Sequence, residues 1–134
     1  MKQLRLAVCL LVVMISIVSC GKDDDGPPSD TAATITVTAP VPNSRYANGG
    51  PLLVRGNIDD QDILKNAKVE IKNKTSGAVL FTQTSATGNL AVYSFDWSWP
   101  VSGVAATFTA TVKITSTDQY DYQTTKEVDV ILDP

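Results

Sequence analysis

Between residues 33 and 132 of this 134-residue chain, apolar and polar side chains alternate with a period of two. β-Branched residues alternate repeatedly with Thr, Lys or Glu, and no stretch carries apolar residues at helical spacing over three turns. Successive side chains of a β-strand point to opposite faces, so this pattern predicts strands with one buried face. The sequence therefore predicts an all-β fold.

The alternation divides into seven short strands separated by polar turns, and about 100 residues suit a single two-sheet sandwich without disulfides. The positions that define the expected strands are Ile35 and Val37; Leu52, Val54 and Ile58; Ala67, Val69 and Ile71; Val79 to Thr82; Leu90 to Trp99, with Tyr93, Phe95, Trp97 and Trp99 on one face; Phe108, Ala110, Val112 and Ile114; and Val128, Val130 and Leu132.

Two segments of this region resemble known bacterial domains. The run from Phe108 to Asp118, followed by a polar turn and Lys126 to Ile131, resembles the last two strands of bacterial immunoglobulin-like and fibronectin-III-like modules. Ile58 to Ile71 is similar to the second-to-third strand crossing of uncharacterised immunoglobulin-like domains of Bacteroidota lipoproteins. The resemblance implies a seven-strand antiparallel immunoglobulin-like β-sandwich over residues 33–134, and it implies no activity.

The N-terminus has the pattern of a secretory signal peptide. Lys2 and Arg5 precede an uncharged stretch from Leu6 to Ser19. As a helix this stretch would reach about 21 Å, which is short of a hydrocarbon core of about 30 Å. Its apolar residues lie on every helix face, which disfavours an amphipathic core helix. We expect residues 1–19 to be removed.

The uncharged stretch ends in Ile17-Val18-Ser19-Cys20, which resembles the lipobox of bacterial lipoproteins. The resemblance implies that Cys20 is acylated, with chains such as palmitate, and becomes the first mature residue. More than one acyl chain gives stable membrane anchoring. Because Cys9 leaves with the signal peptide, the mature domain has no thiol left for a disulfide.

An acidic segment follows the expected lipidation site. Lys22, Asp23, Asp24 and Asp25 resemble the export signal of Bacteroidota lipoproteins displayed on the outer face of the outer membrane. The alternative is a solvated charge run in a linker. Residues 20–32 offer little to a core and are rich in Pro and Asp, so we expect a flexible tether.

The tether ends in Asp30-Thr31-Ala32, which resembles the O-glycosylation acceptor pattern of the same bacterial group. Thr31 is therefore a candidate for glycosylation.

Composition argues against two classes of function. The chain has no His, which removes the commonest general base and zinc ligand, so we expect no enzymatic activity. The mature chain carries 9 basic and 14 acidic residues, a net charge of −5, and has no basic run. A protein of this charge has no electrostatic footprint for a nucleic acid, so we expect no such partner.

Four aspartates form a candidate cation site. In a sandwich of alternating strands, the turn with Asp59, Asp60 and Asp62 emerges at the same end as the turn that follows Asp118. Oxygen ligands of this kind are those that Ca²⁺ prefers. Asp is also an ordinary turn residue that bonds its own backbone, which is the alternative. We expect no cofactor unless this calcium site forms.

Three aromatic residues are candidates for ligand contact. Tyr120 and Tyr122 lie in the last turn, and rings of this kind are favoured in recognition loops. Trp99 precedes Pro100 at a strand end, where it is either the last core layer or a platform for a sugar. The sequence thus predicts a membrane-anchored, non-enzymatic module that binds a protein or glycan or acts as a spacer, with a calcium-dependent envelope protein as the alternative.

Overall fold

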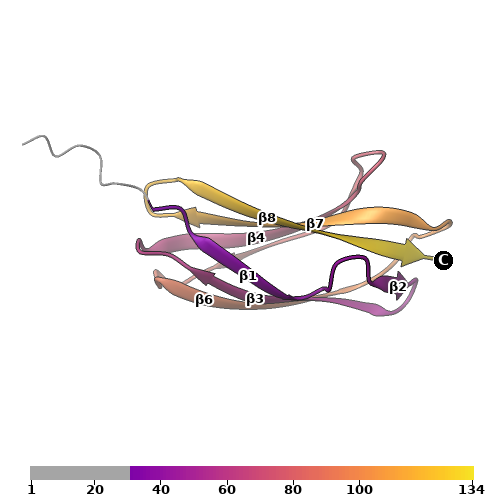
Figure 1. Ribbon diagram of the computed structural model, residues 1–134, viewed down its shortest axis with the longest axis horizontal. Helices are drawn as coiled ribbons and strands as arrows, with labels where there is room; N and C mark the ends of the chain where they lie inside the picture. The colour runs from indigo at the N-terminus through magenta and orange to yellow at the C-terminus, as the bar shows by residue number, and fades with distance from the viewer. Residues whose placement is uncertain (1–30) are drawn as a thin grey trace, which may run out of the picture.

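The computed structural model describes residues 31–134 as a β-sandwich (Figure 1). The predicted signal peptide, Cys20 and the acidic motif lie outside the described residues. Within residues 31–134, no helix is long and apolar enough to cross a membrane. The strands are β1 (Thr34–Ala39), β2 (Arg45–Ala47), β3 (Pro51–Asp59), β4 (Leu64–Asn73), β5 (Val79–Ala86), β6 (Val92–Pro100), β7 (Phe108–Asp118) and β8 (Gln123–Asp133).

The strands form two sheets, which confirms the all-β prediction. One sheet has three strands in the order β1-β3-β6, and the other has five in the order β2-β8-β7-β4-β5. Figure 1 shows the two sheets as layers, with the start of β1 beside the β7–β8 turn and the C-terminus at the opposite end. This arrangement places alternate turns at the same end of the molecule.

The inward faces of the sheets build one core from the alternating residues. Strands β4 and β7 contribute small and branched aliphatic side chains, whereas β6 contributes aromatic ones. Phe95 and Trp97 stack with ring centroids 4.7 Å apart, and Trp97 Nε1 donates to Ser85 Oγ at 3.1 Å. This hydrogen bond joins β6 to β5 across the two sheets and satisfies the buried indole nitrogen.

Gly56 lets β1 and the ring of Phe95 approach β3 closely. A Cβ built on Gly56 would lie 2.0 Å from the carbonyl oxygen of Thr36 and 2.6 Å from Cζ of Phe95. A side chain at this position would have to displace backbone as well as core. Glycine is therefore required here by space.

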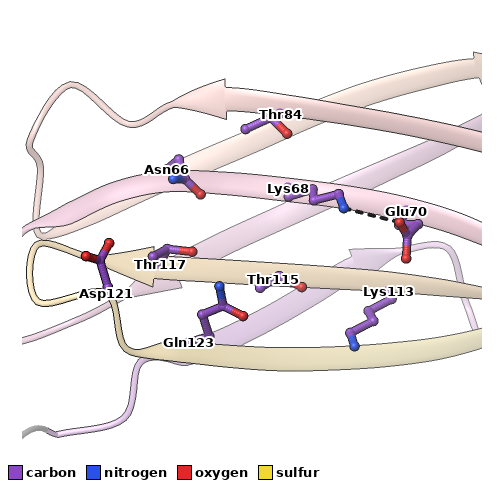
Figure 2. Close-up of a pocket in the computed structure, with 9 residues that line it drawn as sticks. All are labelled: Asn66, Lys68, Glu70, Thr84, Lys113, Thr115, Thr117, Asp121 and Gln123. Atoms are coloured by element: carbon purple, nitrogen blue, oxygen red, sulfur yellow. Dashed lines mark hydrogen bonds and ion pairs between the residues drawn. The ribbon is translucent and has the colours of Figure 1, made fainter.

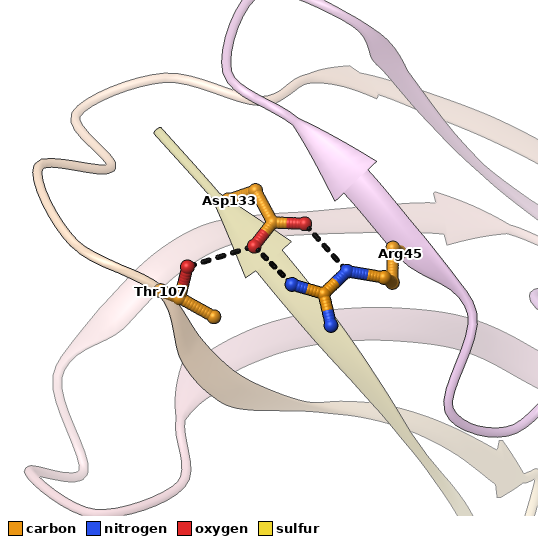
Figure 3. A network of polar contacts seen from close by, with 3 residues as sticks. All are labelled: Arg45, Thr107 and Asp133. Atoms are coloured by element: carbon orange, nitrogen blue, oxygen red, sulfur yellow. Dashed lines mark hydrogen bonds and ion pairs between the residues drawn. The ribbon is translucent and has the colours of Figure 1, made fainter.

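The structure corrects the predicted strand number from seven to eight. The additional strand, β2, lies in a segment expected to be a loop, and it runs parallel to the end of β8, so the sandwich is not wholly antiparallel. Arg45 on β2 makes two hydrogen bonds to Asp133 on β8, at 2.9 and 2.7 Å, and Thr107 donates to the same carboxylate at 2.8 Å (Figure 3). These partners lie far apart in the sequence.

Two predicted strands have different bounds. The short strand expected at Val79 to Thr82 continues to Ala86 and pairs with β4, at the edge of the five-stranded sheet. The strand expected to begin at Leu90 begins at Val92, and Leu90 is exposed. Thr87 Oγ1 donates to the carbonyl of Leu64, which holds the connection before β6 against β4.

Candidate functional site

Three connections meet at the end of the sandwich where β1 begins: β3–β4, β5–β6 and β7–β8 (Figure 1). Backbone hydrogen bonds join them, because Gln119 N donates to Ile63 O at 2.8 Å and Leu64 N donates to Leu90 O at 3.0 Å. The three connections form one continuous surface, which we call the turn end. This confirms the prediction that the turn with Asp59, Asp60 and Asp62 emerges at the same end as the turn after Asp118.

Asp118 fixes the conformation of the β7–β8 turn. Its side chain is buried, at 2% exposure, and Oδ1 accepts hydrogen bonds from the backbone N–H groups of Tyr120 at 2.8 Å and Tyr122 at 2.9 Å. Asp121 has a positive φ of 67° and donates its N–H to the Asp118 carbonyl at 3.2 Å. The turn that carries the two tyrosines is therefore held by a side chain from the core.

The turn end exposes an unusual share of the large apolar side chains. The residues described by the structure include seven such exposed side chains, and five of them lie here, namely Ile63 (40%), Leu90 (53%), Val92 (51%), Tyr120 (48%) and Tyr122 (46%). We call these five the turn patch. The other two, Val41 and Val79, lie in or beside other connections. Most of the exposed large apolar side chains of residues 31–134 therefore lie at this one end.

The predicted calcium ligands are engaged in turn geometry. Asp59 is exposed and pairs with Thr34, while Asp60 is 7% exposed and its Oδ1 accepts from Asp62 N at 3.0 Å. The second oxygen of Asp118, Oδ2, is buried without a hydrogen-bond partner in the described chain. Within residues 31–134, no three carboxylate or other metal-ligating side chains gather closely enough to hold an ion.

The other sequence candidates are placed differently. Trp99 is only 6% exposed and stacks on Phe81 with ring centroids 6.0 Å apart, so its ring belongs to the core and is not presented at the surface. Thr31 is exposed, which leaves its hydroxyl open to modification. Cys20 and the segment Lys22, Asp23, Asp24 and Asp25 lie outside the described residues.

A polar groove of about 490 Å³ lies on the outer face of the five-stranded sheet (Figure 2). It is lined by Asn66, Lys68, Glu70, Thr84, Lys113, Thr115, Thr117, Asp121 and Gln123. Hydrogen bonds from Lys72 and then Lys68 lower the pKa of the Glu70 carboxyl, and the Nζ atoms lie 2.6 and 3.2 Å away. Asp121, at the end near the turn end, pairs with Lys65 at 2.6 Å.

The sequence patterns did not predict Ile63, Leu90 and Val92 as surface residues of a site. They also did not predict the groove. In the sequence, each apolar residue of the turn patch has the pattern of a strand residue or of an isolated turn residue. Their proximity follows only from the pairing of β3 with β6 and of β4 with β7. The polar side of the alternation in β4 and β7 was the available signal for the groove, because it marks one solvent-facing sheet surface.

No protein-family model matches this chain, and no curated protein does. Among solved structures, the chain is similar to the fibronectin(III)-like modules of Clostridium thermocellum CbhA, with 17% identity and a TM-score of 0.50. That match covers 76% of this chain and 47% of the solved one, so this chain spans about half of it. The match shows a fibronectin-III-like fold.

Two further similar structures have lower TM-scores. Murine CRIg gives 8% identity and a TM-score of 0.45, covering 77% of this chain and 98% of that one. A family 76 glycoside hydrolase from a bovine Bacteroides thetaiotaomicron strain gives 15% identity and a TM-score of 0.47, covering 75% of this chain and 20% of that one.

Proposed function

We propose that this chain is a non-enzymatic binding module that contacts a protein through the turn patch. The observation that carries the proposal is that five exposed apolar side chains, from three connections and the start of β6, lie at one end. Interfaces are enriched in aromatic side chains at their centres and have polar rims. Here exposed Asp121 lies between the two tyrosines, and exposed Asp59 pairs with Val92 across β3 and β6. A glycan is the other ligand class that the tyrosines suit.

The turn that presents the tyrosines is preorganised for binding. Asp118 accepts from both tyrosine N–H groups, so little backbone freedom remains to be lost when a partner binds. Tyr side chains have few rotatable bonds and present both a ring and a hydroxyl. These properties favour recognition over a passive spacer role.

The proposal places the module on a membrane. The lipobox resemblance at Cys20 suggests an outer-membrane lipid anchor, and the acidic motif Lys22, Asp23, Asp24 and Asp25 suggests display at the cell exterior. Because β1 starts at the turn end, the tether would join the domain beside the turn patch. The partner would then lie near the membrane surface, or the tether would let the domain tilt.

Photo-crosslinking in the native cell tests the binding proposal. A photoreactive residue is placed at Tyr120 or Leu90, and a matched control is placed at Val41, which is exposed to 63% outside the turn patch. We expect one protein adduct of defined mass from both turn-patch positions and none from Val41. Equal labelling at Val41, or no adduct at the turn patch, would contradict the proposal and favour a spacer.

Anchoring is tested separately. Metabolic labelling with an alkyne fatty acid should mark the wild-type chain and not Cys20→Ala, which should leave the membrane fraction. Replacement of Asp23, Asp24 and Asp25 by Ala should keep the label but remove sensitivity to protease added outside intact cells.

Intact-mass analysis with Thr31→Ala reveals whether a glycan is attached at the end of the tether.

Calcium binding is the second candidate, because Asp118 Oδ2 is buried without a protein partner. An ion would have to recruit the carboxylates of Asp60 and Asp62 from their present turn geometry. At ten times Kd, binding to the folded state alone adds about 1.4 kcal/mol and raises the Tm by about 4 to 8 °C. A rise in millimolar calcium that chelator reverses and Asp60→Asn removes would support this candidate, and an unchanged Tm would refute it.

A further inference from the structure

The outer face of the five-stranded sheet carries a site that is separate from the turn patch. The groove crosses β4, β5, β7 and β8 on the side away from the core, and Figure 2 shows its side chains projecting from one surface. Among the groove residues only Asp121 belongs to the β7–β8 turn. A ligand of the groove would therefore contact mainly strands, of which β4 and β7 are paired on both sides.

Strand register arranges the uncharged polar groups in rows. Asn66, Thr117 and Gln123 face one another across β4, β7 and β8. Thr84, Lys68 and Thr115 form the next row. Neighbouring strands lie about 4.8 Å apart and the rows are separated by about 6.8 Å, or two residues. The hydroxyl and amide groups are thus regularly spaced, with Lys68, Glu70 and Lys113 on the same face.

These groups are free to bond a ligand. None of the uncharged groove side chains makes a side-chain hydrogen bond to the rest of the described chain, namely Asn66, Thr84, Thr115, Thr117 and Gln123. Thr117 is only 8% exposed, yet it lines the groove. Its hydroxyl has no hydrogen-bond partner in the described chain and is not among the fully buried atoms, so it can bond water or a ligand in the groove.

The four charged side chains that line the groove have no net charge, namely Lys68, Lys113, Glu70 and Asp121. Glu70 is paired with Lys68 and Lys72, and Asp121 is paired with Lys65. Lys113 is the groove cation that makes no ion pair with another described residue. One such cation does not supply the row of charges that a phosphate backbone requires. The groove also lacks the large apolar side chains that anchor a protein partner.

We propose that this groove binds an oligosaccharide without net charge. Sugar hydroxyls donate and accept hydrogen bonds, as do threonine hydroxyls and the paired donor and acceptor atoms of Asn and Gln. The groove offers such groups in rows, and its volume of about 490 Å³ falls within the range of small-ligand sites. The groove meets the turn patch only at Asp121, and its proposed ligand is distinct from the proposed protein partner.

The test is chemical-shift mapping on the isotope-labelled domain of residues 31–134, which contains both sheets and the core cluster between them. The probes are cellohexaose, xylohexaose, mannohexaose and maltohexaose, each up to millimolar concentration, with a sulfated heparin hexasaccharide for comparison. We expect at least one neutral probe to shift the amide signals of Asn66, Thr117 and Gln123. Shifts from no neutral probe, from the heparin probe alone, or confined to Tyr120 and Tyr122 would overturn the proposal.

Variants then locate the contact. Thr117→Val keeps the shape of the side chain but removes its hydroxyl, and we expect about tenfold weaker binding of the active probe. Thr109→Val is the matched control, because Thr109 lies on the same face of β7 outside the groove. Its affinity should equal that of the wild type. The melting temperature of each variant checks folding, and equal affinity in Thr117→Val with intact folding would also overturn the proposal.

Discussion

The two ends of the sandwich are built in opposite ways. At the C-terminal end, polar side chains bond each other, since Arg45 and Thr107 both donate to the carboxylate of Asp133 (Figure 3). At the turn end, Asp118 bonds backbone N–H groups from below, and the side chains of Tyr120 and Tyr122 are left exposed. The turn end also has an exposed ion pair between Lys65 and Asp121, but its two tyrosine rings remain exposed.

The carboxyl groups at the two ends differ in how much they contribute to stability. The pair of Arg45 and Asp133 fastens a three-residue strand to the sheet, at a surface where an ion pair contributes little to unfolding free energy. The carboxyl of Asp118 is buried, so its hydrogen bonds carry more weight. We infer that the turn end is rigid in its backbone and adaptable in what its side chains contact.

The largest expected loss of unfolding free energy comes from a substitution that should destabilise the whole sandwich. Gly56→Ala places a methyl group against Thr36 O and the Phe95 ring, and we expect a loss of about 3 kcal/mol in unfolding free energy from overpacking. Gly77→Ala is the control, because its φ of +73° is strained for Ala but no atom lies within 4 Å of the new Cβ. Its cost should be about 1 kcal/mol. Equal costs in urea denaturation would show that the clash is absent.

Removing one carboxyl from each end should cost different amounts of unfolding free energy. Asp118→Ala leaves the N–H groups of Tyr120 and Tyr122 without their acceptor and should cost about 2 kcal/mol. Asp133→Ala breaks a surface pair and should cost clearly less unfolding free energy than Asp118→Ala. Asp118→Asn retains one acceptor oxygen and should fall between them. A larger loss in Asp133→Ala by denaturant titration would reverse the comparison.

Low pH should weaken the ion pairs near the C-terminal end and so lower the stability of the fold. Hydrogen bonds from Arg45 and Thr107 lower the pKa of Asp133, and those from Lys74 and Thr111 lower the pKa of Asp129. Carboxylates with lowered pKa stabilise the fold fully above their unfolded pKa of about 4, and this stabilisation disappears as pH falls through the folded pKa. The melting temperature should therefore drop below about pH 4.

The matched variant for the acid experiment is Asp133→Asn, which cannot titrate. Its melting temperature should fall less steeply with pH than that of the wild type, because one contributing carboxyl is gone. Identical slopes in the two proteins would show that the Asp133 pKa is the same in the folded and unfolded chains.

The smallest stability effect is expected for the tyrosines themselves. Tyr120→Ala and Tyr122→Ala remove half-exposed rings and should each change the unfolding free energy by less than about 0.5 kcal/mol. The double variant should nevertheless lose the cross-link formed from Leu90. A large fall in melting temperature would mean that the rings serve the core, and the turn patch would then be structural.

The fold was largely readable from the sequence because period-two alternation is a local signal. Strands β3, β4, β7 and β8 bury the apolar residues expected from that pattern. Strand β2 was missed because three residues cannot show a period and because Arg45 finds Asp133 only after the chain has folded. Two of the five turn-patch residues, Tyr120 and Tyr122, are predictable from the sequence, whereas the exposure of Leu90 depends on where β6 begins.

Amide hydrogen exchange at Tyr120 and Tyr122 tests most directly whether the exposed rings stand on a fixed turn. Both N–H groups donate to the buried Asp118 carboxyl, so we predict slow exchange in the wild type and fast exchange in Asp118→Ala. The amide of Asn48, which donates to Asp133 O at the other end, should be unchanged by that substitution. Fast exchange at both tyrosines in the wild type would show a mobile turn and contradict the account of a preorganised binding end.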